Sequence, residues 1–231
     1  MRGILLCGGN GTRLKPLTNY TNKHLLGVYN KPMVMYPLQT LLDMGVKDIL
    51  LVTGGEYMGQ FIDLLGSGSK YHCKITYRVQ DQAGGIAQAL LMGKDFVHKQ
   101  FVVILGDNLF EYAPVRPEAC AIVVKEVADP SRFGIYYPET KVIVEKPKNP
   151  TSSKAVLGLY FYTPEVFDFI KNLQPSARGE MEISDVNNWC LQNLPTSVID
   201  YDGFWSDMGT FDSLLNSAQW QAKQELSTLG T

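Results

Sequence analysis

The chain has 231 residues, of which 45% are hydrophobic and 19% are charged. This composition is typical of a globular protein and excludes an intrinsically disordered one. Lysine and arginine number 21 against 23 aspartates and glutamates, so the net charge is −2. That balance excludes bulk electrostatic attraction to nucleic acid or to an acidic membrane as the main activity. An anionic ligand must therefore be bound by a few placed cations.

The cysteines and the N-terminus bear on the cellular compartment. Cys7, Cys73, Cys120 and Cys190 lie far apart in the sequence and form no C-x-x-C pair, and the three histidines are scattered. This spacing argues against a zinc site, a redox dithiol or a disulfide framework. The first apolar run, residues 4–7, is shorter than a signal peptide core of about 7–15 residues or a membrane helix of about 18. We expect a cytoplasmic protein with no membrane partner.

Short apolar runs alternate with helical patterns through the first half of the chain. Continuous apolar runs, typical of strands buried on both faces, lie at residues 4–7, 49–53, 101–105 and 121–124, and a further strand is expected at 75–79. Apolar residues at helical spacing occupy residues 37–44, 58–65 and 86–94. This alternation predicts parallel βαβ units with a helix layer on each face of the sheet.

The pattern changes beyond about residue 125. Prolines interrupt the chain at positions 130, 138, 147 and 150, and a strand with mixed patterning is expected at 156–162. We interpret this half as an antiparallel extension packed on the first half. Because no repeat or polar linker marks a boundary, residues 1–231 are expected to form a single domain. A closing helix is predicted at 211–226, with Thr210 or Asp212 as its N-cap.

The first predicted strand leads into a glycine-rich loop, residues 8–14. Glycines just after a strand let backbone N–H groups approach an anion closely. The loop is not a dinucleotide-binding G-x-G-x-x-G motif, because Leu14 stands where the third glycine is required. A Walker A motif also fails, because the Gly93-Lys94 pair is followed by Asp95.

Two cations accompany this loop. Arg13 offers a planar fork that suits two phosphate oxygens, and Lys23 offers a point charge. They indicate a site for a phosphorylated ligand, although an ordinary tight turn with a surface arginine would show the same pattern.

Two aspartates are candidates for binding a metal ion. Asp107 follows the run at 101–105 through one glycine, at the end of a strand where ligands bind in open α/β sheets. Asp207 lies in a turn just before the closing helix. Mg²⁺ takes one or two carboxylates together with phosphate oxygens and waters, so these two residues could share one ion. The alternative is that they cap a turn and a helix, as many aspartates do.

Blocks spread over nearly the whole chain resemble, in the same order, the signature of the sugar-phosphate nucleotidyltransferases. More narrowly, they are similar to the glucose-1-phosphate thymidylyltransferases within that family. The blocks are Gly8-Gly9-Asn10-Gly11-Thr12-Arg13-Leu14 with Pro16, Lys23-x-Leu25-Leu26, Lys31-Pro32-Met33, Gln80 with Gly85-Ile86-Ala87-Gln88-Ala89, Leu105-Gly106-Asp107-Asn108, Asp129-Pro130 with Phe133-Gly134, Glu145-Lys146-Pro147, Pro175-Ser176-Ala177-Arg178-Gly179-Glu180 and Asp207-x-Gly209-Thr210.

The resemblance implies a fold. It is a Rossmann-like nucleotidyltransferase fold of the α/β class, with a mostly parallel mixed sheet, helices on both faces and a smaller antiparallel sugar-binding extension. The nucleotide-binding half would cover about 1–125 and the sugar-phosphate-binding half about 126–231. Relatives assemble into dimers or tetramers, so a homo-oligomer is expected.

The resemblance also implies a reaction. An oxygen of glucose 1-phosphate attacks the α-phosphorus of dTTP with the help of Mg²⁺, which yields dTDP-glucose and pyrophosphate. Three alternatives stay open: UTP in place of dTTP, another sugar 1-phosphate, or a sensor that binds nucleotide sugars without turnover. No nucleic acid partner is expected.

The family's functional residues carry over onto matching positions. Arg13 and Lys23 would bind the triphosphate, Lys146 the phosphate of the sugar phosphate, and Asp107 and Asp207 the Mg²⁺ ion. The residues expected to bind nucleotide are Leu6, Gly8, Gly9, Gly11, Thr12, Arg13, Lys23, Gln80, Gly85 and Asp107. Those expected to bind sugar phosphate are Asn108, Gly134, Glu145, Lys146, Val156, Tyr160 and Trp205. The catalytic set is Arg13, Lys23, Asp107, Lys146 and Asp207.

Some positions have a simpler interpretation or depart from the family pattern. Gln80 could be a solvated strand end, and Trp205 could serve core packing. The charged residues of 178–182 are interpreted as a structural ion-pair network. The chain departs from the common Gln, Pro, Pro and Thr of its relatives at His24, Gly27, Ala83 and Met208. Longer relatives continue into helices that help form an effector site, so feedback inhibition at such a site is not expected here.

Overall fold

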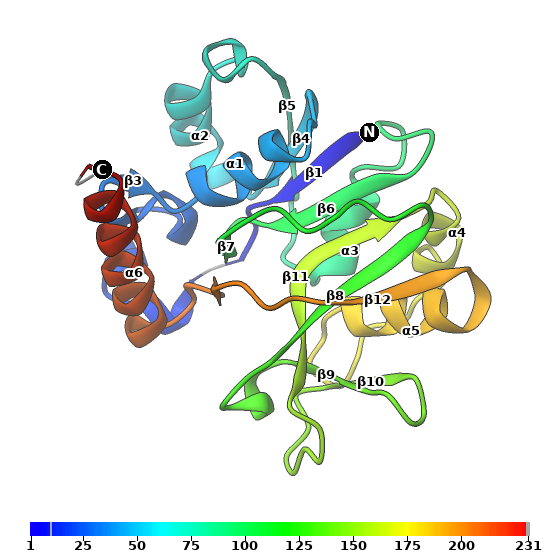
Figure 1. Cartoon of the computed structure of the whole chain (residues 1–231). Coiled ribbons are helices and arrows are strands. Elements are labelled where there is room, and N and C mark those ends of the chain that lie inside the picture. Colours follow the sequence, from blue (N-terminus) through cyan, green and yellow to red (C-terminus); the bar gives the residue numbers. More distant parts are fainter. Residues whose placement is uncertain (10, 230–231) are drawn as a thin grey trace.

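The computed structural model describes residues 1–9 and 11–229, so Asn10 of the glycine loop and residues 230–231 lie outside the described residues. A central mixed sheet has the strand order β10-β9-β11-β6-β1-β4-β5, with β8 paired to β11 and β12 paired to β8. Helices cover both faces of this sheet (Figure 1). The α/β class, the mixed sheet and the two helix layers predicted from the sequence are confirmed.

The nucleus of the sheet is parallel. β1 (Arg2–Leu6) lies between β4 (Asp48–Thr53) and β6 (Phe101–Leu105), and β5 (Lys74–Val79) pairs with the far side of β4. The register places Leu6, the last residue of β1, opposite Val52 and Leu105. Parallel strands in this register end at one edge of the sheet, so the loops after β1, β5 and β6 begin close together.

The second half of the chain contributes more to the sheet than the sequence predicts. β11 (Lys154–Tyr162) lies inside the sheet, antiparallel to β6 on one side and to β8 (Cys120–Glu126) on the other. The run at 121–124, predicted as a strand of a parallel βαβ unit, therefore pairs antiparallel with β11. The reason is that β11 is buried along nearly its whole length and takes the place beside β6. β12 (Thr196–Asp200) then adds to β8 in parallel.

The antiparallel extension consists of short strands. β9 (Gly134–Tyr137) pairs with β10 (Val142–Glu145), and this register sets Gly134 opposite Glu145. Smaller antiparallel pairs form between β2 (Gly27–Val28) and β3 (Lys31–Pro32) and between β7 (Leu109–Phe110) and β13 (Trp205–Ser206). The pairing of β7 with β13 brings the segment after Asp107 next to the segment before Asp207.

Side chains that alternate along the strands pack into two hydrophobic clusters, one on each face of the sheet. Leu5 and Leu51 face one cluster together with α1 (Met35–Asp43) and α2 (Met58–Leu65), whereas Ile4 and Leu50 face the other. The second cluster packs under α3 (Ile86–Leu91), α4 (Val166–Ile170) and α5 (Ile183–Asn193). A strand whose two faces are both covered must be apolar throughout, which is the pattern seen in the sequence.

The last helix, α6 (Phe211–Leu229), packs on a third cluster beside β2 (Figure 1). This cluster includes Val28 and Met208, and the rings of Phe204 and Trp220 stack within it at 4.5 Å. The Thr210 hydroxyl accepts a hydrogen bond from the Ser213 N–H at 3.2 Å, so Thr210 acts as the N-cap. Within the described part of the chain, no helix has both the length and the apolar character needed to cross a membrane.

Candidate active site

A cavity of about 370 Å³ opens where the parallel strands end, between the glycine loop and the antiparallel extension. Sixteen of the residues predicted from the sequence line it: Leu6, Gly8, Gly9, Arg13, Lys23, Gln80, Gly85, Asp107, Asn108, Gly134, Glu145, Lys146, Val156, Tyr160, Trp205 and Asp207. Segments from both halves of the chain thus meet at one place. Their individual roles stay predictions.

Gly11 and Thr12 do not line this cavity. Gly11 has a left-handed backbone with φ of 58°, and a Cβ atom there would lie 2.9 Å from Thr18 Cγ2 and 3.1 Å from Lys23 Cβ. Thr18 Oγ1 also donates a hydrogen bond to the Gly11 carbonyl oxygen at 2.8 Å. Thr12 begins the short 3₁₀ turn Thr12–Leu14, which carries Arg13. In the structure these two residues shape the loop, and their contact with a nucleotide stays a prediction.

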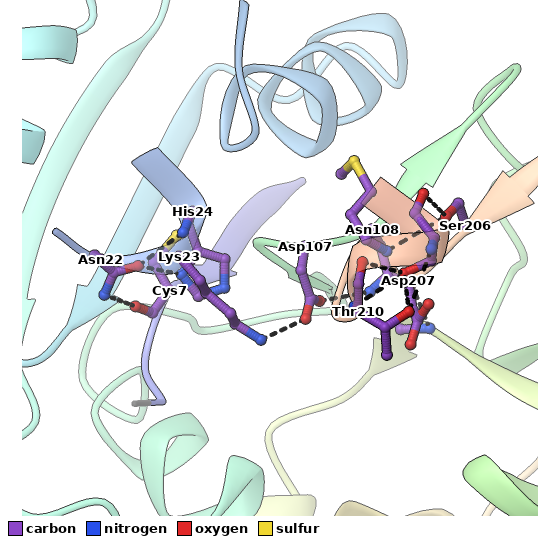
Figure 2. Close-up of polar contacts among 12 residues, drawn as sticks. Cys7, Asn22, Lys23, His24, Asp107, Asn108, Ser206, Asp207 and Thr210 are labelled. Carbon is purple, nitrogen blue, oxygen red and sulfur yellow. Dashed lines mark hydrogen bonds and ion pairs between the residues drawn. The ribbon is translucent and has the colours of Figure 1, made fainter. Parts of the chain in front are cut away.

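Lys23 and Asp107 form an ion pair at the cavity wall. Lys23 Nζ lies 2.5 Å from Asp107 Oδ2, and Asn108 Nδ2 donates to Asp107 Oδ1 at 2.9 Å (Figure 2). Burial alone raises the pKa of the Asp107 carboxyl. The charge of Lys23 and hydrogen bonds from Lys23 and Asn108 outweigh burial and leave this pKa below its ordinary value. Asp107 is therefore a carboxylate at neutral pH.

The turn that carries Lys23 is hydrogen-bonded to the residue that follows β1. The Asn22 side chain accepts a hydrogen bond from the His24 backbone N–H at 2.9 Å and contacts His24 Nδ1 at 2.6 Å. Asn22 Nδ2 donates to the Cys7 carbonyl oxygen at 3.2 Å (Figure 2). Burial, helped by the neighbouring Lys23 charge, lowers the pKa of His24 to about 3. The imidazole is therefore neutral at pH 7, where it fills the space behind Lys23 without adding charge.

Asp207 pairs with one arginine and lies near a second from another part of the chain. Its Oδ2 atom forms an ion pair with Arg132 Nη2 at 2.9 Å. A side chain at Gly209 would meet Arg13 Nη2 at 3.1 Å and Asp207 Oδ2 at 3.5 Å, which places the Arg13 guanidinium beside the same carboxylate. Arg132 was missed in the sequence, although it stands directly before the Phe133-Gly134 block.

Glu145 is the centre of a polar cluster on the side of the cavity formed by the antiparallel extension. Its Oε2 accepts a hydrogen bond from Ser184 Oγ at 2.5 Å, and its Oε1 lies 3.3 Å from Lys146 Nζ. Arg178 binds Glu182 through two nitrogens, at 3.0 and 2.7 Å, and reaches Glu145 at 3.5 Å. The ion-pair network expected around residue 178 is present, and it also touches the rim of the cavity.

Asn108 and Trp205 are hydrogen-bonded to each other. Asn108 Oδ1 accepts hydrogen bonds from Trp205 Nε1 at 2.8 Å and from the Gly158 N–H at 3.1 Å. The Trp205 ring packs edge-on against Phe133 at 5.4 Å. Because Asn108 Nδ2 binds Asp107, this one amide fixes both a carboxylate and an aromatic wall of the cavity.

Gln80 lies at the other end of the cavity, where β5 ends. Its Nε2 donates to Gln88 Oε1 at 2.8 Å, and the same oxygen accepts from the Gly84 N–H at 2.9 Å. Gln88 thereby orients Gln80 toward the glycine loop, since a side chain at Gly8 would meet Gln80 Oε1 at 3.0 Å. The predicted interpretation of Gln80 as a fully solvated strand end does not fit this arrangement.

Further lining residues were given no role from the sequence, although several of them lie in the blocks that resemble the family. They are His24, Ala83, Ile86, Ala89, Leu105, Arg132, Phe133, Gly158, Glu180, Ile183, Ser184 and Asn187. Most are small or apolar, and ordinary core positions have the same residue types. Asn187 is buried and accepts a hydrogen bond from the Tyr162 hydroxyl at 2.5 Å, while its Nδ2 has no hydrogen-bond partner among the described residues.

The donor atoms of the cavity fit a hard divalent cation shared with a ligand. Asp107 and Asp207 both line it. Within residues 1–9 and 11–229 there is no group of three or more His, Cys, Asp or Glu side chains placed to hold a metal. Such a pair suits Mg²⁺, which uses one or two carboxylates and completes its shell with phosphate oxygens and water. It does not suit zinc, which takes three or four protein ligands.

Comparison with known proteins decides the family. Residues 2–224 match the family model described as nucleotidyl transferase. The chain belongs to this family. It is 39% identical to the glucose-1-phosphate thymidylyltransferase of Neisseria meningitidis, over 99% of this chain and 85% of the relative. It is 42% identical to the enzyme of the same name from Mycolicibacterium smegmatis, over 98% of this chain and 84% of the relative.

Solved structures agree with this membership of the nucleotidyl transferase family. A Bacillus anthracis chain assigned as a glucose-1-phosphate thymidylyltransferase, in complex with a sucrose, superposes with a TM-score of 0.89. That chain is 45% identical, with 95% of this chain and 94% of the other covered. A UDP-glucose pyrophosphorylase in complex with UDP-glucose has a TM-score of 0.84 over 96% and 98% of the two chains. At 22% identity, it shows the shared fold alone.

The lowered pKa of Asp107 predicts a pH dependence of stability. Its pKa lies below the ordinary 3.8, so the Lys23–Asp107 pair stabilises the fold fully above pH 3.8. This contribution is lost as the pH falls through the lowered value. Asp107→Asn should therefore cost the same free energy of unfolding at pH 7 and pH 5, and less at pH 3. Urea unfolding at the three pH values measures this, and an equal cost at all three would contradict the assignment.

Proposed function

We propose that this chain is a glucose-1-phosphate thymidylyltransferase, which forms dTDP-glucose and pyrophosphate from dTTP and glucose 1-phosphate. The observation that carries the proposal is the composition of the cavity wall. Arg13, Lys23 and Lys146 line one cavity together with Asp107 and Asp207. The similarity to thymidylyltransferases over nearly the whole chain supports the same reaction.

The reaction requires the protein to bring two anions together. A phosphate oxygen of the sugar 1-phosphate attacks the α-phosphorus of the nucleotide, and pyrophosphate leaves in line. Alignment and neutralisation of charge do most of the work in such transfers, so a covalent nucleophile is not needed. The chain carries a net charge of −2, so these cations act locally at the cavity.

Each charged residue has a role that its position supports. Arg13 and Lys23 lie on the turns beside the glycine loop and would bind the triphosphate. Lys146 lies at the end of β10 and would bind the phosphate of the sugar phosphate. Asp107 and Asp207 would hold Mg²⁺, which when bound supplies positive charge at the phosphate oxygens. Removing one such charge-stabilising group typically lowers the rate by about 10²–10³.

The uncharged parts of the cavity would select the base and the sugar. Gln80 offers an amide donor and an acceptor to a pyrimidine edge, and Gly85, just before α3, would present its backbone to the base. Glu145 would accept hydrogen bonds from sugar hydroxyls, with Trp205 as a wall. The bonds of Asn108 to Asp107 and Trp205 support a positioning function in addition to its predicted contact with sugar phosphate.

Two alternatives are compatible with the same cavity. UTP differs from dTTP by a methyl group and a 2′-hydroxyl, and an apolar pocket gains only about 1–3 kcal/mol from one methyl, so use of both nucleotides is expected. Other sugar 1-phosphates present the same phosphate group to these cations. A sensor without turnover is disfavoured, because binding alone does not need two carboxylates facing these cations.

The setting of the reaction is also part of the proposal. Cys7, Cys73, Cys120 and Cys190 are free thiols in the structure, which supports a reducing, cytoplasmic compartment. We further propose that the protein works as a homo-oligomer.

A pyrophosphate-release assay tests the proposed reaction. Four nucleoside triphosphates are crossed with a panel of sugar 1-phosphates, with and without Mg²⁺. We expect the highest rate for dTTP with glucose 1-phosphate, a lower rate for UTP, and no turnover without a divalent cation. If every pair is bound but none is turned over, the sensor alternative replaces the enzyme.

The sugar side is tested by Glu145→Gln. This change removes the negative charge that pairs with Lys146 and that accepts a hydrogen bond from the Ser184 hydroxyl. The KM for glucose 1-phosphate should therefore rise about tenfold or more, while the KM for dTTP changes little. Steady-state kinetics with each substrate varied in turn gives both constants. Glu139→Gln, at an exposed position outside this cavity, is the control. Equal rises in both KM values would contradict the role of Glu145.

A further inference from the structure

Arg132 is a charged residue of the cavity that the sequence analysis did not assign. It ends the short turn Pro130–Arg132 just before β9, and its guanidinium reaches across the cavity to Asp207. Nη2 of Arg132 lies 2.9 Å from Asp207 Oδ2. The side chain of Arg132 is 32% exposed and that of Asp207 is 16% exposed. The arginine is therefore the more accessible partner of this pair.

The surroundings of Arg132 connect it to Lys146. Its guanidinium lies over the ring of Phe133, 5.2 Å from the ring centre. The Phe133 carbonyl oxygen accepts a hydrogen bond from the Lys146 N–H at 3.0 Å. The segments that carry Arg132 and Lys146 are thus bonded directly, and both side chains line the cavity. Two cations on one cavity wall fit a phosphate group, with the arginine fork able to bind two of its oxygens.

The chain next to Asp207 is constrained by packing and hydrogen bonding. Met208, the next residue, has a φ of 39°, an uncommon left-handed conformation for a residue with a side chain, and its side chain is buried in the cluster under α6. The N–H of Met208 also donates to Ser206 Oγ at 3.4 Å. If the Arg132–Asp207 pair opens, the long arginine side chain can move while the aspartate stays in place.

Asp207 Oδ2 cannot bind a divalent cation fully while it is paired with Arg132, so the cation and the arginine compete for this oxygen. We propose that Arg132 is a further phosphate-binding residue, and that Asp207 holds it until a divalent cation takes its place on the carboxylate. The released guanidinium then binds a phosphate oxygen of the substrates. This inference rests on the proposed function for the identity of the phosphate. Because a metal ion on Asp207 releases Arg132 for phosphate, metal binding should strengthen phosphate binding, and phosphate binding should strengthen metal binding.

Metal binding to the nucleotide-free protein tests the first half of the exchange. Mn²⁺ serves as the probe, and its binding is followed by electron paramagnetic resonance. Arg132→Gln removes the ion pair of Asp207 with Arg132 and should bind Mn²⁺ about fivefold more tightly than the wild type, since an ion pair of this exposure no longer competes. The double variant Arg132→Gln with Asp207→Asn should lose this gain.

A matched control separates partner exchange from a general change of charge. Lys146→Gln also removes one positive charge from the cavity wall, but Lys146 pairs with Glu145 and not with Asp207. It should therefore leave the Mn²⁺ affinity close to that of the wild type. An equal gain in Lys146→Gln, or no gain in Arg132→Gln, would overturn the exchange.

Pyrophosphate binding tests the second half. With Mn²⁺ at saturation, Arg132→Gln should bind pyrophosphate at least tenfold more weakly than the wild type, and Arg132→Lys should restore part of the loss. Unchanged pyrophosphate affinity in Arg132→Gln would overturn the phosphate-binding role. Both measurements are made without turnover, so a negative result here is distinct from a failure of the proposed reaction in the pyrophosphate-release assay.

Discussion

The phosphates of two anionic substrates must meet in a protein whose own net charge is −2, and the structure depends on this constraint. In the structure, side chains of opposite charge line one cavity. Lys23 pairs with Asp107 and Arg132 pairs with Asp207, so these opposite charges balance each other. A ligand that brings its own charge and a metal ion can exchange these partners without leaving a buried charge unpaired, which would be costly.

The sheet makes this gathering possible. Because β1, β4, β5 and β6 run parallel in a fixed register, the glycine loop, Gln80 and Asp107 reach one edge. The antiparallel pair β9 and β10 brings Gly134 and Glu145 to the facing side, and β13 on β7 brings Asp207 next to Asn108. The chemistry therefore rests on main-chain pairing, and the two ends of the cavity belong to one continuous sheet.

Local patterns were enough to predict the parts of the site that follow strands. The apolar run at 101–105 coincides with β6, which placed Asp107 correctly, and the strand at 75–79 placed Gln80. These local patterns could not predict which distant segments contact each other. The position of β11 beside β6, and with it the antiparallel pairing of β8, depends on competition among apolar strands that look alike in sequence. Arg132 was missed because a lone arginine in a turn is common on protein surfaces.

We propose that dTDP-glucose spans this cavity from Gln80 to Glu145, and a crystal structure of that complex is the most direct test. We predict that the base lies against Gln80 and Gly85, the diphosphate among Arg13, Lys146 and the two aspartates, and the glucose against Glu145 and Trp205. A nucleotide sugar bound elsewhere, or one whose phosphates lie away from these cations, would contradict it.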